Sequence, residues 1–248
     1  MVTHSKTGET EQIERSTKSV KRGRKEDVPV LNSLEELQEL PISVAKAKEE
    51  GSYFLRWKNP DGSLGGFHAD SRIANDVFID PSAVVVDSKV RPGTKIGAKS
   101  IIYSSTIGRN NAIGSGCEIR DTESGDKLVM GDNCYVCSRV TADSDHEDEG
   151  VVIGDDVVVG QGVEITNAFI GKKVSIGAES LIEGFNHVYL GDRVKIGAKV
   201  KVEDDCAIQQ DSTVPDGAKV LRHTILDNFK VPKGSIEEAA VFKMDVRK

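Results

Sequence analysis

The strongest constraint on the fold is an aliphatic residue that recurs about every six positions through most of the chain. The series runs through Ile73, Ile79, Val84, Val90, Ile96, Ile101, Ile107, Ile113 and Ile119, and then Ile153, Val159, Ile165, Ile170, Ile176, Ile182, Leu190, Ile196, Val202, Ile208, Val214 and Val220. Met130, Val136 and Ala142 continue it between the two runs. A short fixed period is typical of a solenoid, in which stacked repeats bury one continuous core.

Two further columns keep phase with the aliphatic residue. Glycine follows it at Gly97, Gly108, Gly114, Gly131, Gly154, Gly160, Gly171, Gly177, Gly191 and Gly197. The fourth position after it is usually small or β-branched, with Asn111, Glu123 and Phe169 as exceptions. Because glycine suits a tight corner with unusual backbone angles, each unit is interpreted as a short strand followed by a turn.

Three such units make one triangular coil, and coils stack at about the 4.8 Å spacing of neighbouring strands. Counting in threes predicts about eight coils between residues 73 and 220. Residues are inserted in the steps 119 to 130, 142 to 153 and 182 to 190, and in this count all three insertions leave the prism at the same corner. Loops on a rigid scaffold often carry binding residues.

The aliphatic-Gly-x-x-small-x pattern resembles the hexapeptide-repeat family of transferase-like proteins, and the resemblance covers residues 71–221. It implies an all-β fold, a left-handed parallel β-helix. The left-handed winding comes from the resemblance alone, because parallel crossovers are otherwise right-handed.

The remaining segments are expected to be appendages. Residues 1–30 are polar, lack periodicity and are expected to be a disordered basic and polar tail. Residues 31–70 predict an N-terminal cap of two short helices, at 33–40 and 43–50, followed by a hairpin. Residues 222–248 form a C-terminal extension, in which Ser235-Ile236-Glu237-Glu238 has the pattern of a helix start.

Charge and hydropathy exclude several partners. The net charge of −7 disfavours nucleic acid, apart from weak contact through the basic cluster at residues 21–25. No apolar run is long enough for a membrane span, and the N-terminus does not have the pattern of a signal peptide. A cytoplasmic protein is expected.

No metal site is predicted. Cys134 and Cys137 have no second pair, and Cys117, Cys134 and Cys206 fall in the small interior column, which favours packing. The acidic stretch 143–150 lacks the glycine and glutamate positions of a calcium loop. No two histidines are spaced closely enough for the three-histidine zinc site of some hexapeptide-repeat proteins.

The resemblance implies an acyltransferase, since most characterised members are acyltransferases in which a histidine beside the prism acts as general base. His187 is the best match, with Asn186 as a partner, and His146 has a weaker claim. Acyl-CoA would be a co-substrate, with no tightly bound cofactor, and the acceptor would be a small hydroxyl or amine compound. A homotrimer is also implied. After Val220, the segment Leu221-Arg222-His223-Thr224 departs from the family's usual Gly-Asn-Pro-Ala, so a non-catalytic scaffold or assembly subunit stays open.

Overall fold

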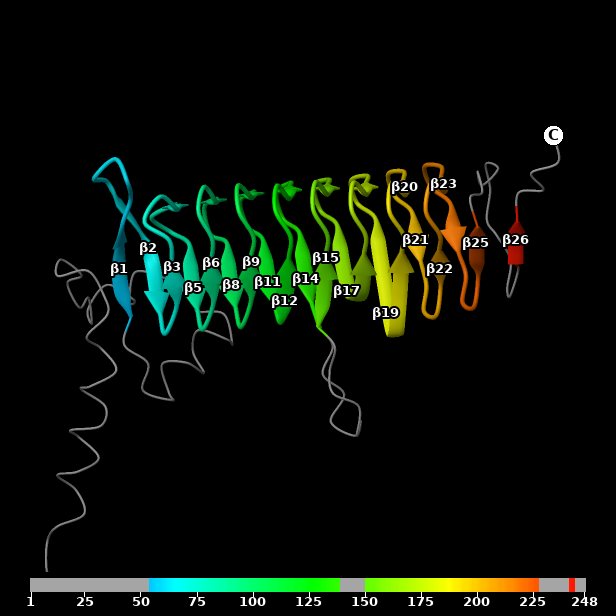
Figure 1. Cartoon of the computed structure of the whole chain (residues 1–248), viewed down its shortest axis with the longest axis horizontal. Coiled ribbons are helices and arrows are strands. Elements are labelled where there is room, and N and C mark those ends of the chain that lie inside the picture. Colours follow the sequence, from blue (N-terminus) through cyan, green and yellow to red (C-terminus); the bar gives the residue numbers. More distant parts are fainter. Residues whose placement is uncertain (1–53, 139–149, 228–240, 244–248) are drawn as a thin grey trace, which may run out of the picture.

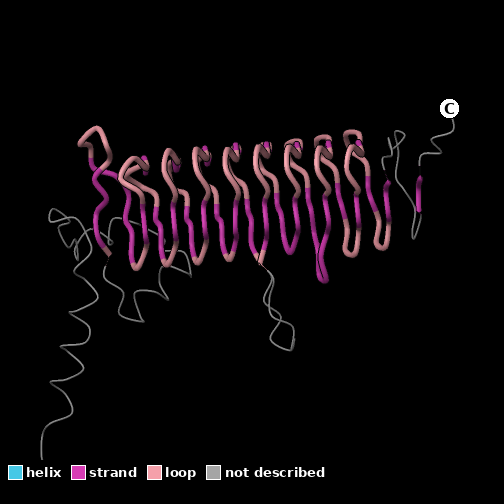
Figure 2. Tube along the Cα trace, viewed as in Figure 1, coloured by secondary structure: helices cyan, strands magenta, loops and turns pink. Residues whose placement is uncertain are grey.

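The chain forms a long rod of stacked three-sided coils (Figure 1). The computed structural model describes residues 54–138, 150–227 and 241–243. Within those ranges every regular element is a β-strand, which confirms the predicted all-β solenoid (Figure 2). The described residues contain no helix that is long and apolar enough to cross a membrane.

Each coil passes through three flat faces of the prism, which are numbered here in the order in which the chain passes through them. The second face is an eight-stranded parallel sheet. Its strands are β4 (Phe78–Ile79), β7 (Lys95–Ile96), β10 (Ala112–Ile113), β13 (Val129–Met130), β16 (Val158–Val159), β18 (Ser175–Ile176), β20 (Lys195–Ile196) and β23 (Thr213–Val214). Each belongs to one coil, so this face agrees with the prediction of about eight coils, and Ile225–Asp227 pairs with Ala207–Ile208 as the first strand of a further coil.

The first and third faces share one sheet because β17 (Glu164–Ile170) and β19 (Leu181–Leu190) run through the corner between them. The first face has β3 (Arg72–Ile73), β6 (Lys89–Val90), β9 (Thr106–Ile107), β12 (Thr122–Ser124), β15 (Val151–Ile153), β22 (Ala207–Ile208), β25 (Ile225–Asp227) and β26 (Val241–Lys243). The third face has β2 (Leu64–Ala69), β5 (Val84–Val86), β8 (Ile101–Tyr103), β11 (Glu118–Arg120), β14 (Tyr135–Cys137), β21 (Lys201–Val202) and β24 (Lys219–Val220).

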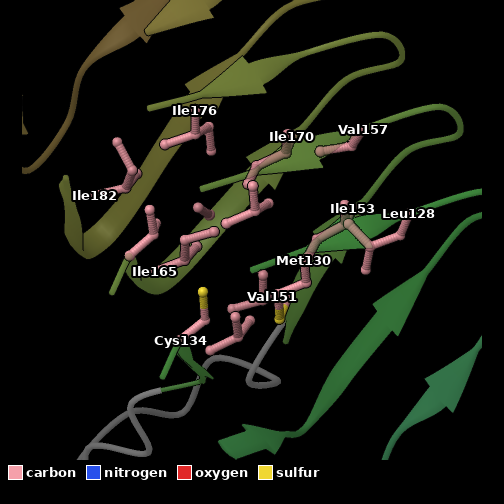
Figure 3. Close-up of a cluster of buried hydrophobic side chains, with 14 of the residues drawn as sticks. Leu128, Met130, Cys134, Val151, Ile153, Val157, Ile165, Ile170, Ile176 and Ile182 are labelled. Carbon is pink, nitrogen blue, oxygen red and sulfur yellow. The ribbon is translucent and has the colours of Figure 1, made fainter. Parts of the chain in front are cut away.

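Aliphatic side chains fill the prism in layers. Figure 3 shows Ile165 and Ile170 of β17, Ile176 of β18 and Ile182 of β19 converging on the interior. All four are buried, and the backbone of each coil bonds to the next, as in Ser175 N–H to Val194 O at 3.0 Å. The core needs few aromatic residues because each layer is thin.

The position of the aliphatic column on the third face was predicted wrongly in the first two coils. The prediction placed Val84 and Ile101 inside, whereas Val85 and Ile102 point inward and are fully buried. Runs of adjacent β-branched residues on these strands fit either alignment, and stacking on Ile119 selects the second. The five-residue steps therefore fall at the corner between the third and first faces.

The insertion predicted in the step from 119 to 130, at residues 120–129, is also wrong. Residues 122–124 form β12, a regular strand whose Ser124 pairs in register with Ile153. A serine thus occupies the inward column, and the hydrophobic pattern could not reveal a coil that lacks its aliphatic residue there.

A buried amide supports this serine. Asn111 lies inside the prism at 1% exposure, and its Nδ2 donates to Ser124 Oγ at 2.9 Å. Its Oδ1 accepts the N–H of Leu128 at 2.9 Å. Ser124 Oγ also accepts the N–H of Gly108 at 3.2 Å. Each polar side-chain atom of this pair therefore has a hydrogen-bond partner, which makes a polar layer tolerable in an aliphatic core.

We expect Asn111→Ala to destabilise the protein by about 2–3 kcal/mol, because it leaves the buried Leu128 N–H unpaired and opens a cavity. The double variant Asn111→Val with Ser124→Val refills the volume but leaves the backbone N–H groups of Leu128 and Gly108 without acceptors, so it should stay clearly less stable than the wild type. Denaturant unfolding of both variants measures the difference. A double variant as stable as the wild type would contradict the argument.

The glycine column has a different cause from the one predicted. Gly108 has no positive φ, but a Cβ on it would lie 2.0 Å from the carbonyl oxygen of Gly125 in the next coil. The left-handed turn positions are instead taken mostly by non-glycine residues such as Asn110, with φ of 55°. Glycine in this column allows coils to stack closely.

At the N-terminal end, β1 (Leu55–Lys58) pairs antiparallel with β2. Trp57 lies inside the prism, where its Nε1–H donates to Val77 O at 3.0 Å. The helices expected at 33–40 and 43–50, and the helix start at 235–238, lie outside the described residues.

Candidate functional site

Two of the three predicted insertions leave the prism at the same corner, between the third and first faces. The segment from Cys137 to Val151 joins β14 to β15 across this corner, and β19 crosses it with three extra residues between Ile182 and Leu190. Regular coils pass the same corner in five residues, as from Ile165 to Ile170. In Figure 2, β19 reaches past the row of neighbouring corners.

His187 lies on the projecting part of β19 and is half-buried. Its ring meets the ring of Phe169 edge to face, with centroids 5.2 Å apart and planes at 84°. Phe169 belongs to β17, in the coil before. The contact is of the favourable T-shaped kind and fixes the imidazole against the first-face side of the corner.

Asn167 ties the corner together across three coils. It adopts the left-handed conformation, with φ of 42°, and its Nδ2 donates to Gly184 O at 3.0 Å. Its Oδ1 accepts a hydrogen bond from Ser138 Oγ at 3.3 Å. A Cβ at Gly184 would lie 2.6 Å from Asn167 O, so glycine is required for the close approach. The sequence reasoning missed Asn167, although its place in a five-residue unit was visible.

Polar side chains also gather on the outer third face beside the corner. Glu118 and Arg120 form an ion pair, and Cys137 lies in register with Thr166. Thr166 Oγ1 is buried and has no hydrogen-bond partner among the described residues. Burial raises the pKa of the Cys137 thiol, and hydrogen bonding to Cys137 raises the pKa of Tyr135 to about 12. Cys137 is therefore protonated near neutral pH and does not have the character of an activated thiolate.

The predicted partners of His187 are described only in part. The side chain of Asn186, and all of the weaker candidate His146, lie outside the described residues. Glu183, which could also orient the imidazole, lies on β19 with its carboxylate 3.9 Å from Lys201 Nζ. Asn186 and His146 therefore remain candidates from the sequence.

The outer column of the first face changes character along the rod. It starts with Arg72, Lys89, Thr106 and Glu123 and continues, in register, with Val152, Phe169, Tyr189, Ala207 and Ile225. Val152, Tyr189 and Ile225 are exposed. The apolar part of this column begins at Val152 and continues through Phe169 and Tyr189. His187 lies at its edge, in contact with Phe169.

A shallow hollow of about 350 Å³ lies at the same corner but in the first three coils. Asp70, Arg72, Asp87 and Lys89 line it. Its buried hydroxyls are satisfied, since Ser88 Oγ donates to Val86 O at 2.6 Å and accepts the N–H of Ser105 at 3.1 Å. The hollow is open and mixed in charge, and it contains no histidine.

The cysteines lie where the sequence placed them. All four are free and buried, and Cys117, Cys134 and Cys206 are inside the prism. Cys134 Sγ donates to Gly160 O at 3.0 Å. No group of three or more metal-ligating side chains occurs among the described residues.

The repeat and the stacked coils define a hexapeptide-repeat β-solenoid protein. No protein-family model matches the chain, and no curated protein sequence matches it. Among solved structures, the UDP-N-acetylglucosamine acyltransferase of Arabidopsis is similar, at 14% identity and a TM-score of 0.48 over 67% of this chain. The chain spans 65% of that enzyme's length.

Two further structures have lower TM-scores. A hexapeptide transferase family protein from Anaplasma phagocytophilum has a TM-score of 0.37 and 18% identity, covering 70% of this chain and 82% of that one. An N-acyltransferase from Bacillus cereus, solved with dTDP and coenzyme A, has a TM-score of 0.34 and 16% identity, covering 54% and 74%. Likenesses at this level carry no information about the activity of this chain.

Proposed function

We propose that the protein is an acyltransferase that moves an acyl group from acyl-CoA to a hydroxyl or amine acceptor. The observation that carries the proposal is the position of His187, held edge to face against Phe169 at the corner where β19 projects. An imidazole at such a corner can act as a general base near neutral pH.

The proposed reaction needs few protein groups. His187 accepts the proton of the acceptor hydroxyl or amine as that atom attacks the thioester carbonyl. The carbon–sulfur bond then breaks, and the CoA thiolate leaves and takes up a proton. A backbone N–H at the corner would stabilise the negative charge on the carbonyl oxygen. The apolar column of Val152, Phe169 and Tyr189 would lie beside the acyl group.

Binding of the donor tests the proposal directly. We expect acetyl-CoA, succinyl-CoA or free CoA to raise the melting temperature, because a ligand that binds only the folded state stabilises it by mass action. At a hundredfold excess over the Kd the gain is about 2.7 kcal/mol. Absence of any shift with all three compounds at millimolar concentration would count against the enzyme.

The proposed assembly is a homotrimer in which copies pack around a threefold axis. Light scattering at micromolar concentration should then give about three times the chain mass of 26.8 kDa. A monomer mass would contradict the trimer and would weaken the acyltransferase proposal with it.

A non-catalytic assembly subunit is the second candidate. It is favoured by apolar side chains on the outer second face, where Val129 and Val158 are neighbours in register and both about half exposed. Contiguous exposed apolar residues are typical of interaction surfaces. A stable oligomer without CoA binding would favour this candidate.

A further inference from the structure

The hollow in the first three coils is lined by a three-residue row that recurs every 17 residues. The rows are Asp70-Ser71-Arg72, Asp87-Ser88-Lys89 and Ser104-Ser105-Thr106, and all of these residues except Ser71 line the hollow. The third residue of each row lies on β3, β6 or β9, and these strands pair in register (Figure 1). Like positions therefore stack above one another, at about 4.8 Å from row to row.

The middle residues of the rows form a ladder of hydroxyl groups beneath the hollow. Ser71 Oγ accepts the N–H of Ser88 at 3.1 Å, and Ser88 Oγ accepts the N–H of Ser105 at 3.1 Å. Each hydroxyl also donates to the carbonyl oxygen two residues before it, as in Ser105 Oγ to Tyr103 O at 2.7 Å. The backbone under the hollow is thereby held in place, so a ligand meets a preformed surface.

The outer residues of the first two rows give the hollow one negative side and one positive side. Asp70 and Asp87 occupy the left-handed corner position, with φ of 49° and 43°. Arg72 and Lys89 lie beside them on the first face, paired in register. All four side chains are exposed, and none forms a side-chain hydrogen bond or ion pair with another described residue. Their charges are therefore available to a ligand.

A molecule with one ammonium group and one carboxylate group matches this arrangement. The two carboxylates and two cations of the hollow sum to zero, so an ion of a single sign is attracted by one side and repelled by the other. A guanidinium offers paired N–H donors to a carboxylate, and an aspartate accepts from an ammonium. Every residue that lines the hollow is polar or charged, and its volume of about 350 Å³ suits a small molecule.

The next rows limit the extent of this site along the rod. Ser104 and Thr106 replace the charged pair by two neutral hydroxyl groups, which can both donate and accept hydrogen bonds. In the row after that, Glu123 lies in register with Thr106 in the column that began with cations. The opposed charges are therefore confined to the first two rows, and the ligand is a compact one.

We infer that the hollow binds a small zwitterion. Its ammonium group lies between Asp70 and Asp87, and its carboxylate group contacts Arg72 and Lys89. The inference does not rest on the acyltransferase proposal, because the last row of the hollow lies four coil steps, about 19 Å, from the coil of His187.

Three probes with the same four-carbon chain test the inference on the full-length protein. γ-Aminobutyrate carries both groups, butyrate only the carboxylate and butylamine only the ammonium. In saturation-transfer NMR, γ-aminobutyrate should bind saturably at millimolar concentration and about fivefold more tightly than either other probe, because exposed ion pairs are individually weak. Equal affinities for the three probes, or no saturable binding of γ-aminobutyrate, overturn the inference.

Removal of the positive side should move two probes in opposite directions. Arg72→Gln with Lys89→Gln should weaken γ-aminobutyrate about fivefold and strengthen butylamine, since the carboxylates stay and the cations that repel an ammonium are gone. The matched control is Arg91→Gln with Lys95→Gln, which removes the same charges outside the hollow and should change neither affinity. A hollow variant that behaves like this control, or that weakens both probes, overturns the inference.

Removal of one negative charge is the converse test. Asp87→Asn should weaken γ-aminobutyrate about threefold and strengthen butyrate. Asparagine tolerates the left-handed φ of 43° at this position, so the backbone should keep its path, and an unchanged melting temperature checks this. Asp76→Asn, at an exposed position outside the hollow, is the control. A folded Asp87→Asn variant that binds both probes as the wild type does also overturns the inference.

Discussion

Replacement of His187 by alanine is expected to lower turnover of an acyl-CoA and acceptor pair by about 10²–10⁴. The loss follows because a general base removes the acceptor proton in the transition state, and water is a poor substitute at neutral pH. CoA binding should stay within a few-fold of the wild type, since the imidazole acts on the acceptor. Steady-state kinetics with a thiol reagent that detects released CoA measures the change.

Two variants separate catalysis from packing at this corner. His223→Ala removes an exposed imidazole that lies 3.5 Å from Asp205 at the far end of the coils, and it should leave turnover unchanged. Phe169→Leu keeps an apolar side chain but removes the ring against His187, so turnover should fall less than with His187→Ala. An unchanged rate in His187→Ala would remove this residue from the mechanism.

The fold could be predicted because three columns, in phase, repeat through about 150 residues. Prediction failed where a position in one of these columns holds a residue of another type or where two adjacent residues fit the column equally well. Ser124 stands in the aliphatic column, and only its hydrogen bonds to Asn111 show that β12 is a regular strand. Val84 and Val85 are equally good core residues, so their order was set by stacking between coils and not by composition.

The sequence pointed to the corner at which the candidate site is placed, but it did not identify all the residues that pack there. Insertions mark the corner because a constant period makes extra residues visible, and two of the three proved to be real insertions. Asn167 and Phe169 were missed as site residues because a regular five-residue unit shows no insertion. Their contacts depend on the coil that follows, which the spacing alone does not describe.

Stability should depend most on the middle of the rod, and Ile165→Ala is expected to cost about 2–5 kcal/mol. Ile165 is fully buried on β17, and it stacks in register between Val136 and Ile182 of the adjacent coils. In a solenoid each coil is stabilised by its two neighbours, so a cavity in a central layer weakens two interfaces at once.

Denaturant unfolding at fixed protein concentration measures that cost, since any oligomer makes stability depend on concentration. Val158→Ala is the matched control, because its side chain is 49% exposed on β16, and it should change stability by no more than about 0.5 kcal/mol. Equal losses in the two variants would show that the interior layers do not carry the stability of the rod. A large loss in Val158→Ala alone would instead show that the outer second face is buried by another chain, which would favour the assembly candidate over a free rod.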